Sequence, residues 1–91
     1  MSEQAVFDSL KYRIETDASG TRRYYNSAGQ LHRLEGPAVV YAGGAMCWYQ
    51  NGRLHRIDGP AVAMYGGHAE WFLYGRRLSE AEFNRAITQY E

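Results

Sequence analysis

The chain has 91 residues, of which 45% are hydrophobic and 14% aromatic, and its formal net charge is zero. This length predicts a single domain over residues 1–91, and the apolar and aromatic content excludes a disordered segment. The charge also differs from that of a dedicated nucleic-acid binder, although seven arginines against three acidic residues give residues 20–77 a local balance of +4.

The N-terminal segment, residues 1–19, is acidic and precedes the repeated part of the chain. Residues 2–10 are expected to form one or two helical turns, with Val6, Phe7 and Leu10 on the inner side. A first β-strand follows, and the turn sequence Asp-Ala-Ser-Gly at residues 17–20 joins it to a second strand.

Residues 20–78 contain a tandem repeat with a period of 23 residues. The segment 31–39 reads Leu-His-Arg-Leu-Glu-Gly-Pro-Ala-Val and recurs over 54–62 as Leu-His-Arg-Ile-Asp-Gly-Pro-Ala-Val. A third copy ends after Gly75. The same step relates glycines and large aromatic residues outside this block: Gly20, Gly43 and Gly66; Tyr25, Trp48 and Trp71; Gly29, Gly52 and Gly75. Such a period is typical of stacked supersecondary units.

Short β-type runs separated by glycine turns predict that each unit is a β-hairpin. The pairs Gly43-Gly44 and Gly66-Gly67 each join two such runs, and Asn51-Gly52 and Ala28-Gly29 are further turns. The expected strands cover residues 12–16, 21–25, 39–41, 45–50, 62–65 and 68–74. The predicted fold class is therefore mainly β, an antiparallel meander of stacked β-hairpin repeats with a C-terminal α-helix.

The final segment, residues 79–91, is expected to form that helix near residues 80–90. Ser79 and Glu82 make a capping box, in which each side chain accepts a backbone N–H of the other residue. The apolar stripe of the helix consists of Leu78, Phe83, Ala86, Ile87 and Tyr90. The helix would cover the open end or one face of the sheet, because an uncovered edge invites aggregation.

Alternation along the aromatic strands predicts which side chains are free to meet a partner. The column of Tyr25, Trp48 and Trp71 keeps a large aromatic residue in every copy, so we assign it to the packed face. The opposite parity mixes charged and aromatic side chains, which are typical interface anchors. The predicted partner-binding residues are Arg22, Tyr24, Tyr49, His68, Glu70 and Phe72. The alternative is that a terminal helix covers this second face.

The two histidines of the repeat, His32 and His55, are interpreted as structural residues. Because they recur at the repeat period, each should occupy the same position and satisfy turn carbonyl groups or stack on the next copy. General acid–base catalysis is the alternative, but an enzyme needs one distinctive site and a repeat supplies equivalent ones. His68 lies outside the block and is assigned to a surface contact. We therefore expect no catalytic residue and no enzyme activity.

Metal and cofactor sites are not expected either. Cys47 is the only cysteine, and between Met46 and Trp48 it resembles a half-buried apolar residue more than a reactive thiol. The sequence therefore lacks a disulfide framework and a cysteine-pair zinc site, and its glycine pairs lack the lysine of a phosphate-binding loop. No apolar run approaches the ~20 residues of a membrane-spanning helix, and the N-terminus does not resemble a signal peptide. We expect a soluble, cytoplasmic protein.

The block over residues 48–61, Trp-Tyr-Gln-Asn-Gly-Arg-Leu-His-Arg-Ile-Asp-Gly-Pro-Ala, resembles a tandem motif of small bacteriophage and prophage proteins. It is also similar to the membrane occupation and recognition nexus (MORN) repeat, whose units form a ladder of hairpins. The phage resemblance implies a small non-catalytic accessory protein. It raises the hypothesis of a counter-defence (anti-CRISPR-like) inhibitor that occupies a surface of a host protein complex in the host cytoplasm.

A second hypothesis belongs to a different functional class. The aromatic residues interleaved with arginines in the basic middle resemble a stacking platform, which predicts binding to nucleic acid or another anionic surface. Such binding would weaken steeply as salt increases, whereas a protein contact centred on buried aromatic residues would not. The sequence also allows a homodimer.

Overall fold

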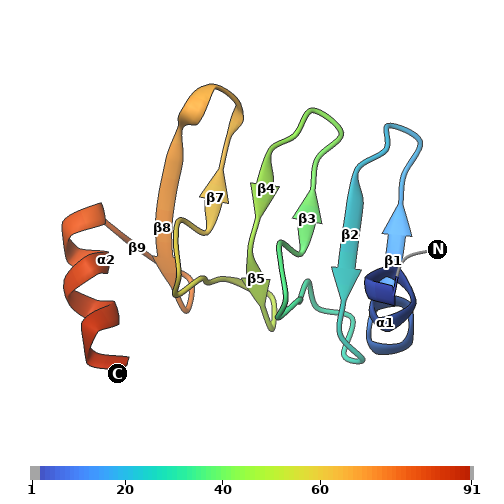
Figure 1. Cartoon of the computed structure of the whole chain (residues 1–91), viewed down its shortest axis with the longest axis horizontal. Helices are drawn as coiled ribbons and strands as arrows, with labels where there is room; N and C mark the ends of the chain where they lie inside the picture. Colours follow the sequence, from blue (N-terminus) through green and yellow to red (C-terminus); the bar gives the residue numbers. More distant parts are fainter. Residues whose placement is uncertain (1–2, 91) are drawn as a thin grey trace.

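The computed structural model describes residues 3–90 and shows a row of β-hairpins with a helix at each end (Figure 1). The helical elements are α1 (Glu3–Lys11), η1 (Tyr65–Gly67), α2 (Glu80–Ile87) and η2 (Thr88–Tyr90). The strands are β1 (Arg13–Thr16), β2 (Arg22–Tyr25), β3 (Val39–Val40), β4 (Met46–Cys47), β5 (Tyr49–Gln50), β6 (Arg53–Leu54), β7 (Val62–Ala63), β8 (Ala69–Leu73) and β9 (Arg76–Leu78).

Seven strands form one sheet in the order β1-β2-β3-β4-β7-β8-β9, and β5 pairs with β6 in a small second ladder. All of these pairings are antiparallel. Neighbouring strands of this sheet are also consecutive in the chain, with one exception. Strands β4 and β7 pair with each other, although the β5–β6 hairpin lies between them in the sequence. The predicted antiparallel meander with a C-terminal helix is confirmed.

Three turns at one rim of the sheet repeat the same geometry. In each turn, one backbone N–H donates to the carbonyl oxygen four residues later. The residue directly before that acceptor is a glycine with positive φ, a conformation that glycine tolerates best. The donor–acceptor pairs are Asp17–Thr21, Tyr41–Ala45 and Met64–His68. The glycines are Gly20, Gly44 and Gly67, with φ of 95°, 102° and 89°. A constant period of 23 predicts Gly20, Gly43 and Gly66 at this position. In the second and third turns the glycine at this position is therefore one residue later than predicted.

Strand β2, which belongs to the first repeat unit, is displaced by one residue relative to the equivalent strands of the other two units, β4 and β8. The His32 N–H donates to the carbonyl oxygen of Tyr24, and the His55 N–H donates to that of Trp48, both at 3.0 Å. Because the two histidines are equivalent, Tyr24 occupies the position of Trp48. Tyr25 therefore does not belong to the predicted aromatic column.

A longer turn in the first unit causes this displacement. Asn51-Gly52 and Tyr74-Gly75 are two-residue turns with positive φ at both positions, as in type I′ hairpins. The first unit instead forms a longer turn over residues 26–30, in which the Asn26 N–H donates to the Gln30 carbonyl oxygen at 2.9 Å. The additional residue lies in this turn, and after it the period of 23 holds again.

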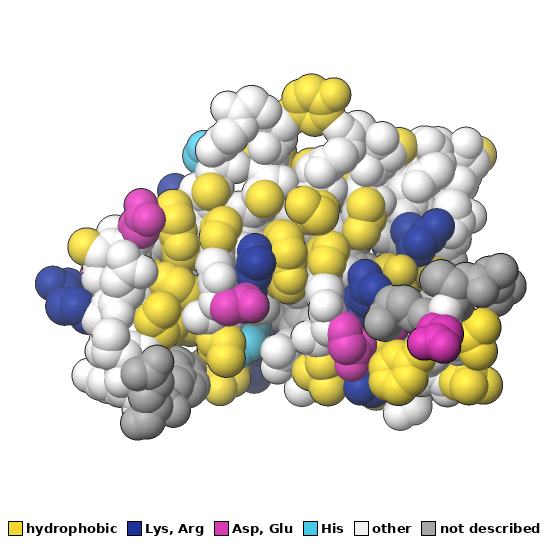
Figure 2. Space-filling model, viewed as in Figure 1, with side chains coloured by type: hydrophobic (Ala, Val, Ile, Leu, Met, Phe, Trp, Pro, Cys, Tyr) yellow, Lys and Arg dark blue, Asp and Glu magenta, His cyan; other side chains and the backbone are white. Residues whose placement is uncertain are grey.

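The pairing register gives the sheet two faces, because directly paired side chains project to the same side and alternate residues to opposite sides. The central row of the first, which we call the covered face, is Arg22, Val40, Met46, Ala63 and Ala69. The central row of the second, which we call the open face, is Arg23, Val39, Cys47, Val62 and Glu70. Figure 2 shows hydrophobic side chains across the middle of the covered face.

We call residues 32–38 and 55–61, which lead into β3 and β7, the two repeat loops. An arginine holds each repeat loop against the covered face. The Arg33 guanidinium carbon lies 4.1 Å from the centroid of the Tyr24 ring, and that of Arg56 lies 3.8 Å from the Trp48 ring. Each guanidinium also donates to the proline carbonyl oxygen four residues later, at 3.3 and 3.1 Å. The glycine before each proline leaves room for this side chain, since a Cβ there would lie 3.1 or 3.0 Å from guanidinium atoms.

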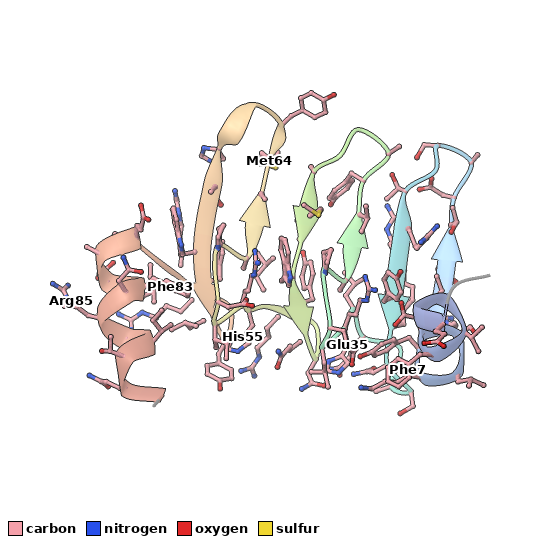
Figure 3. The ribbon with its side chains drawn as sticks, viewed as in Figure 1. Phe7, Glu35, His55, Met64, Phe83 and Arg85 are labelled. Atoms are coloured by element: carbon pink, nitrogen blue, oxygen red, sulfur yellow. The ribbon has the colours of Figure 1, made fainter. Side chains whose placement is uncertain are left out.

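Helix α1 packs on the covered face beside β1 and is fixed there by charged groups. Asp8 is 3% exposed and forms an ion pair of 2.8 Å with Arg33. Glu35 accepts hydrogen bonds from the Lys11 ammonium group and the Tyr12 hydroxyl, each at 2.8 Å. Figure 3 shows Glu35 beside this helix. These contacts join the N-terminal segment to the first repeat loop.

The expected orientation of α1 is wrong. Val6, Phe7 and Leu10 are 44%, 48% and 84% exposed, whereas Asp8 and Tyr12 are buried. The polar partners of these buried residues, Arg33 and Glu35, lie in the first repeat loop, so hydrogen bonds and an ion pair decide which side of the helix faces inward. The first residue of the expected helix, at position 2, lies outside the described residues.

Helix α2 begins at the predicted capping box. The Ser79 hydroxyl accepts from the Glu82 N–H at 3.1 Å, and the Glu82 carboxylate accepts from the Ser79 N–H at 2.8 Å. Phe83 is 2% exposed and points toward β8 and β9, against which the helix packs (Figure 3). The side chain of Tyr90, the last residue of the predicted apolar stripe, lies outside the described residues.

Truncating the two equivalent arginines should have unequal effects on stability. We expect Arg33→Ala to lower the free energy of unfolding by about 3 kcal/mol, because the buried Asp8 carboxylate loses its ion-pair partner. We expect about 1–2 kcal/mol for Arg56→Ala, since its carboxylate partner Asp58 is already in water. Urea denaturation followed by circular dichroism measures both values. Equal losses would contradict the special role of the Asp8–Arg33 pair.

Candidate functional site

The open face carries a row of aromatic side chains at equivalent positions of the three units. Tyr25, Tyr49 and Phe72 each pair with the segment that returns from the adjacent turn, and all three are half-buried. Within residues 3–90, α1 lies in front of the sheet on the covered face, α2 lies at its end, and no helix lies behind the strands (Figure 1). The three aromatic side chains are therefore partly exposed with no helix above them, whereas Val39 and Cys47 on the same face are buried.

Charged residues flank this row at the β1 end of the sheet. The Arg23 guanidinium forms an ion pair of 2.9 Å with Asp17, and the Arg13 guanidinium lies 4.4 Å from the Tyr25 ring centroid. Hydrogen bonds from Ser19 and from Arg23 hold the pKa of the Asp17 carboxyl well below its usual range. The Asp17 carboxylate therefore stays ionised, and the ion pair formed, throughout the neutral pH range.

A second charged group flanks the row at the β8 end. The Glu70 carboxylate lies 2.9 Å from His68 Nε2 and 3.8 Å from the Arg77 guanidinium. The hydrogen bond from His68 lowers the pKa of the Glu70 carboxyl, and the nearby Arg77 charge acts in the same direction. The open face thus combines an aromatic centre with oppositely charged groups at each end.

Cys47 lies within this aromatic surface and is 8% exposed. Burial raises the pKa of its thiol, which disfavours the reactive thiolate form. Burial also raises the pKa of the neighbouring Tyr49 hydroxyl. Both groups are therefore neutral near pH 7, and the geometry fits the interpretation of Cys47 as a small apolar residue of the sheet.

The structure brings four of the six predicted partner-binding residues together on the open face. These four are Tyr49, His68, Glu70 and Phe72. The other two, Arg22 and Tyr24, lie on the covered face, where Tyr24 is 3% exposed beneath Arg33. The one-residue displacement of the first unit explains this error, since it inverts the alternation of β2 relative to β4 and β8.

Sequence reasoning missed the open-face residues of the first unit and of the flanking strands and turn, which are Arg13, Arg23, Tyr25, Tyr41 and Arg77. The assignment of Tyr25 to the packed face is wrong, whereas Trp48 does lie beneath an arginine on the covered face. A signal was present in the chain, because His32 follows Tyr24 by eight residues and His55 follows Trp48 by seven. Aligning the histidines with the preceding aromatic residues reveals the insertion.

The repeat histidines occupy equivalent positions and link each unit to the next. His32 Nδ1 accepts the Asn51 N–H at 2.9 Å, and His55 Nδ1 accepts the Tyr74 N–H at 3.0 Å. The His55 ring also stacks on Tyr74, with centroids 4.2 Å apart. The expected equivalence is confirmed for both histidines, and the expected stacking on the next copy is confirmed for His55. The predicted bonds to turn carbonyls are wrong, because in both cases Nδ1 accepts a turn N–H. This bond requires an unprotonated Nδ1.

A groove of about 440 Å³ lies between the two repeat loops on the covered face. The four charged side chains that line it, Arg33, Glu35, Arg56 and Asp58, are already paired within the molecule. Arg33 pairs with Asp8, Glu35 with Lys11, and Arg56 with Asp58. The groove therefore offers a ligand few charged groups that are not engaged, and the open face is the better candidate site.

The His55 hydrogen bond should make stability depend on pH. Burial lowers the pKa of the His55 imidazole in the folded chain, whereas in the unfolded chain it titrates near ~6.5. As the pH is lowered below about 6.5, the unfolded chain takes up the proton before the folded chain does. The free energy of unfolding should therefore decrease as the pH decreases, until folded His55 is also protonated. Urea denaturation at a series of pH values measures this loss.

The control for this pH dependence is His55→Asn, whose amide oxygen can accept the Tyr74 N–H without titrating. Between about pH 7 and about pH 5.5, we expect this variant to lose less stability than the wild-type protein. The remaining histidines and the carboxylates contribute equally to both proteins. An identical loss in both would show that His55 does not titrate differently in the folded and unfolded chains.

Among residues 3–90, no group of three or more His, Cys, Asp and Glu side chains is placed to hold a metal ion. No helix in this range has the length and apolar character needed to cross a membrane. Comparison with known protein families, with curated proteins and with solved structures found no match.

Proposed function

We propose that this protein is a non-catalytic binding module that occupies a surface of a partner protein through its open face. The observation that carries the proposal is the partly exposed row of Tyr25, Tyr49 and Phe72, held in register by equivalent strand positions. Aromatic side chains on a rigid sheet lose little conformational freedom on binding, and they dominate the energetics of protein interfaces.

The charge of the open face favours a protein partner over nucleic acid. At the β1 end Arg13 pairs with Glu15 and Arg23 with Asp17, and at the β8 end Arg77 lies beside Glu70, so the formal charges of these groups balance. The arginines of the repeat loops are already stacked on Tyr24 and Trp48, so these rings and guanidinium groups are engaged within the fold. A nucleic-acid platform needs free rings and an unpaired basic groove.

The biological setting in this proposal rests on the tandem motif over residues 48–61 and its resemblance to small phage proteins. In that setting the partner is a host protein complex in the host cytoplasm, and the module acts as an inhibitor by covering a surface that the complex needs. Such an inhibitor requires a rigid complementary surface and no chemistry of its own.

The test is the double substitution Tyr49→Ala with Phe72→Ala. A tagged wild-type chain isolates the partner from host lysate, and calorimetry with the purified partner then gives the dissociation constant of each variant. We expect binding to weaken at least about thirtyfold, because one hot-spot aromatic residue contributes about 2 kcal/mol or more. Circular dichroism and a melting curve verify that the variant is folded.

The matched control removes two exposed apolar side chains from the covered-face loops, by Leu34→Ala with Ile57→Ala. This variant should bind as the wild-type chain does. Normal binding by the Tyr49 and Phe72 variant, or an equal loss in the control, would contradict the assignment of the open face. Binding that instead follows an oligonucleotide and weakens steeply with salt would favour the nucleic-acid hypothesis.

A further inference from the structure

Strand β1 lies at the edge of the seven-stranded sheet and, within residues 3–90, pairs only with β2. The Asp17 N–H donates to the Thr21 carbonyl oxygen at 3.0 Å, which identifies these two residues as a hydrogen-bonded pair of the ladder. Because such pairs alternate along antiparallel strands, Arg13 and Glu15 bond to β2, and the backbone groups of Ile14 point to the free edge. This edge can accept another strand.

The order of charges along β1 is complementary to itself. If two copies of β1 run antiparallel about a twofold axis at Ile14, Arg13 of each copy lies opposite the partner's Glu15. The two Ile14 residues then exchange backbone hydrogen bonds, so each Arg–Glu combination falls at a non-hydrogen-bonded position, where side chains are closer. Within one chain the two side chains form an ion pair of 3.7 Å, and both are more than half exposed. Pairing across the twofold axis would exchange this exposed ion pair for two between the copies.

The opposite edge of the sheet lacks this property. Strand β9 has Arg77 at its centre, and the same twofold arrangement would place it opposite the partner's Arg77. Like charges directly opposite each other destabilise a strand pair. Self-association through one edge therefore favours β1 and does not continue from β9 into a fibre.

Helix α1 packs beside the β1 edge on the covered face. It exposes Val6, Phe7 and Leu10, which lie three and four residues apart on one side of the helix. Figure 2 shows hydrophobic side chains gathered at this end of the molecule. A twofold axis perpendicular to the sheet keeps both copies of α1 on the same side, beside the joined edges. The Phe7 ring lies 5.4 Å from the Lys11 ammonium group, which binds Glu35 of the first repeat loop. Phe7 therefore points along the covered face, and the strand edge itself supplies the contact between the two copies.

We propose that two copies of this chain form a dimer by antiparallel pairing of their β1 strands, with the two α1 helices side by side on the covered face. The joined sheet places both open faces on the same side and doubles the aromatic row. The proposal is independent of the function proposed above, because it concerns the purified chain without any other partner.

The test uses charge reversal and size-exclusion chromatography with multi-angle light scattering over a range of protein concentrations. We expect the wild-type chain to be dimeric, and Arg13→Glu or Glu15→Arg to weaken the dimer at least about tenfold, because each places like charges opposite each other. The double variant R13E/E15R should restore the dimer. Mixing the two single variants should also give a dimer, since opposite charges then meet across the edge.

Two controls separate the edge from general effects of charge and folding. Ile14→Pro removes the outward N–H and should give a folded monomer, because proline is tolerated at the outer side of an edge strand. Arg85→Glu changes the same charge on α2, where the side chain points away from the sheet (Figure 3), and should leave the dimer intact. A monomeric wild-type chain, or single reversals that form dimers while the mixture shows no gain, would overturn the proposal.

Discussion

The stacking of an arginine on an aromatic ring is the contact on which the remaining structure depends. A single-layer sheet has no second layer to bury its aromatic residues, so each repeat loop must fold back over its own strand. Arg33 on Tyr24 and Arg56 on Trp48 perform this function at 4.1 and 3.8 Å, in contacts that contribute on the order of 1 kcal/mol each. The glycine that follows each arginine three residues later leaves room for the guanidinium, since a Cβ there would lie only 3.1 or 3.0 Å from guanidinium atoms and would displace them slightly.

This contact makes the two faces of the sheet unequal. Both repeat loops and α1 lie on the covered face, and the hydrogen bonds from turn N–H groups to His32 and His55 join successive units without crossing to the open face. The equivalent open-face aromatic residues therefore have no loop above them. Since the same loops that stabilise the covered face leave the other one free, stability and partner binding can be carried by different side chains of the same strands.

Much of this fold follows from the sequence, because glycine turns and the capping box at Ser79 act locally. The face of β2 does not follow from a constant period, since one additional residue between Tyr24 and His32 inverts the alternation. The orientation of α1 also defeats a rule based on hydrophobicity. Its docking is decided by Asp8 and Tyr12, whose partners lie more than twenty residues away in the chain, so no local pattern shows that these polar residues face inward.

The first repeat unit shows how a tandem array ends. In the second unit the loop is self-contained, because Arg56 Nε donates to Asp58 within the same loop. In the first unit α1 attracts Glu35, the equivalent of Asp58, and Arg33 instead pairs with Asp8 of the helix; its buried Nε is left without a hydrogen bond. A repeat that gives up an internal bond to hold a helix cannot stack a further identical unit on that side. The array therefore stops at α1, and within residues 3–90 β1 is left as the strand edge at which we propose that a second copy pairs.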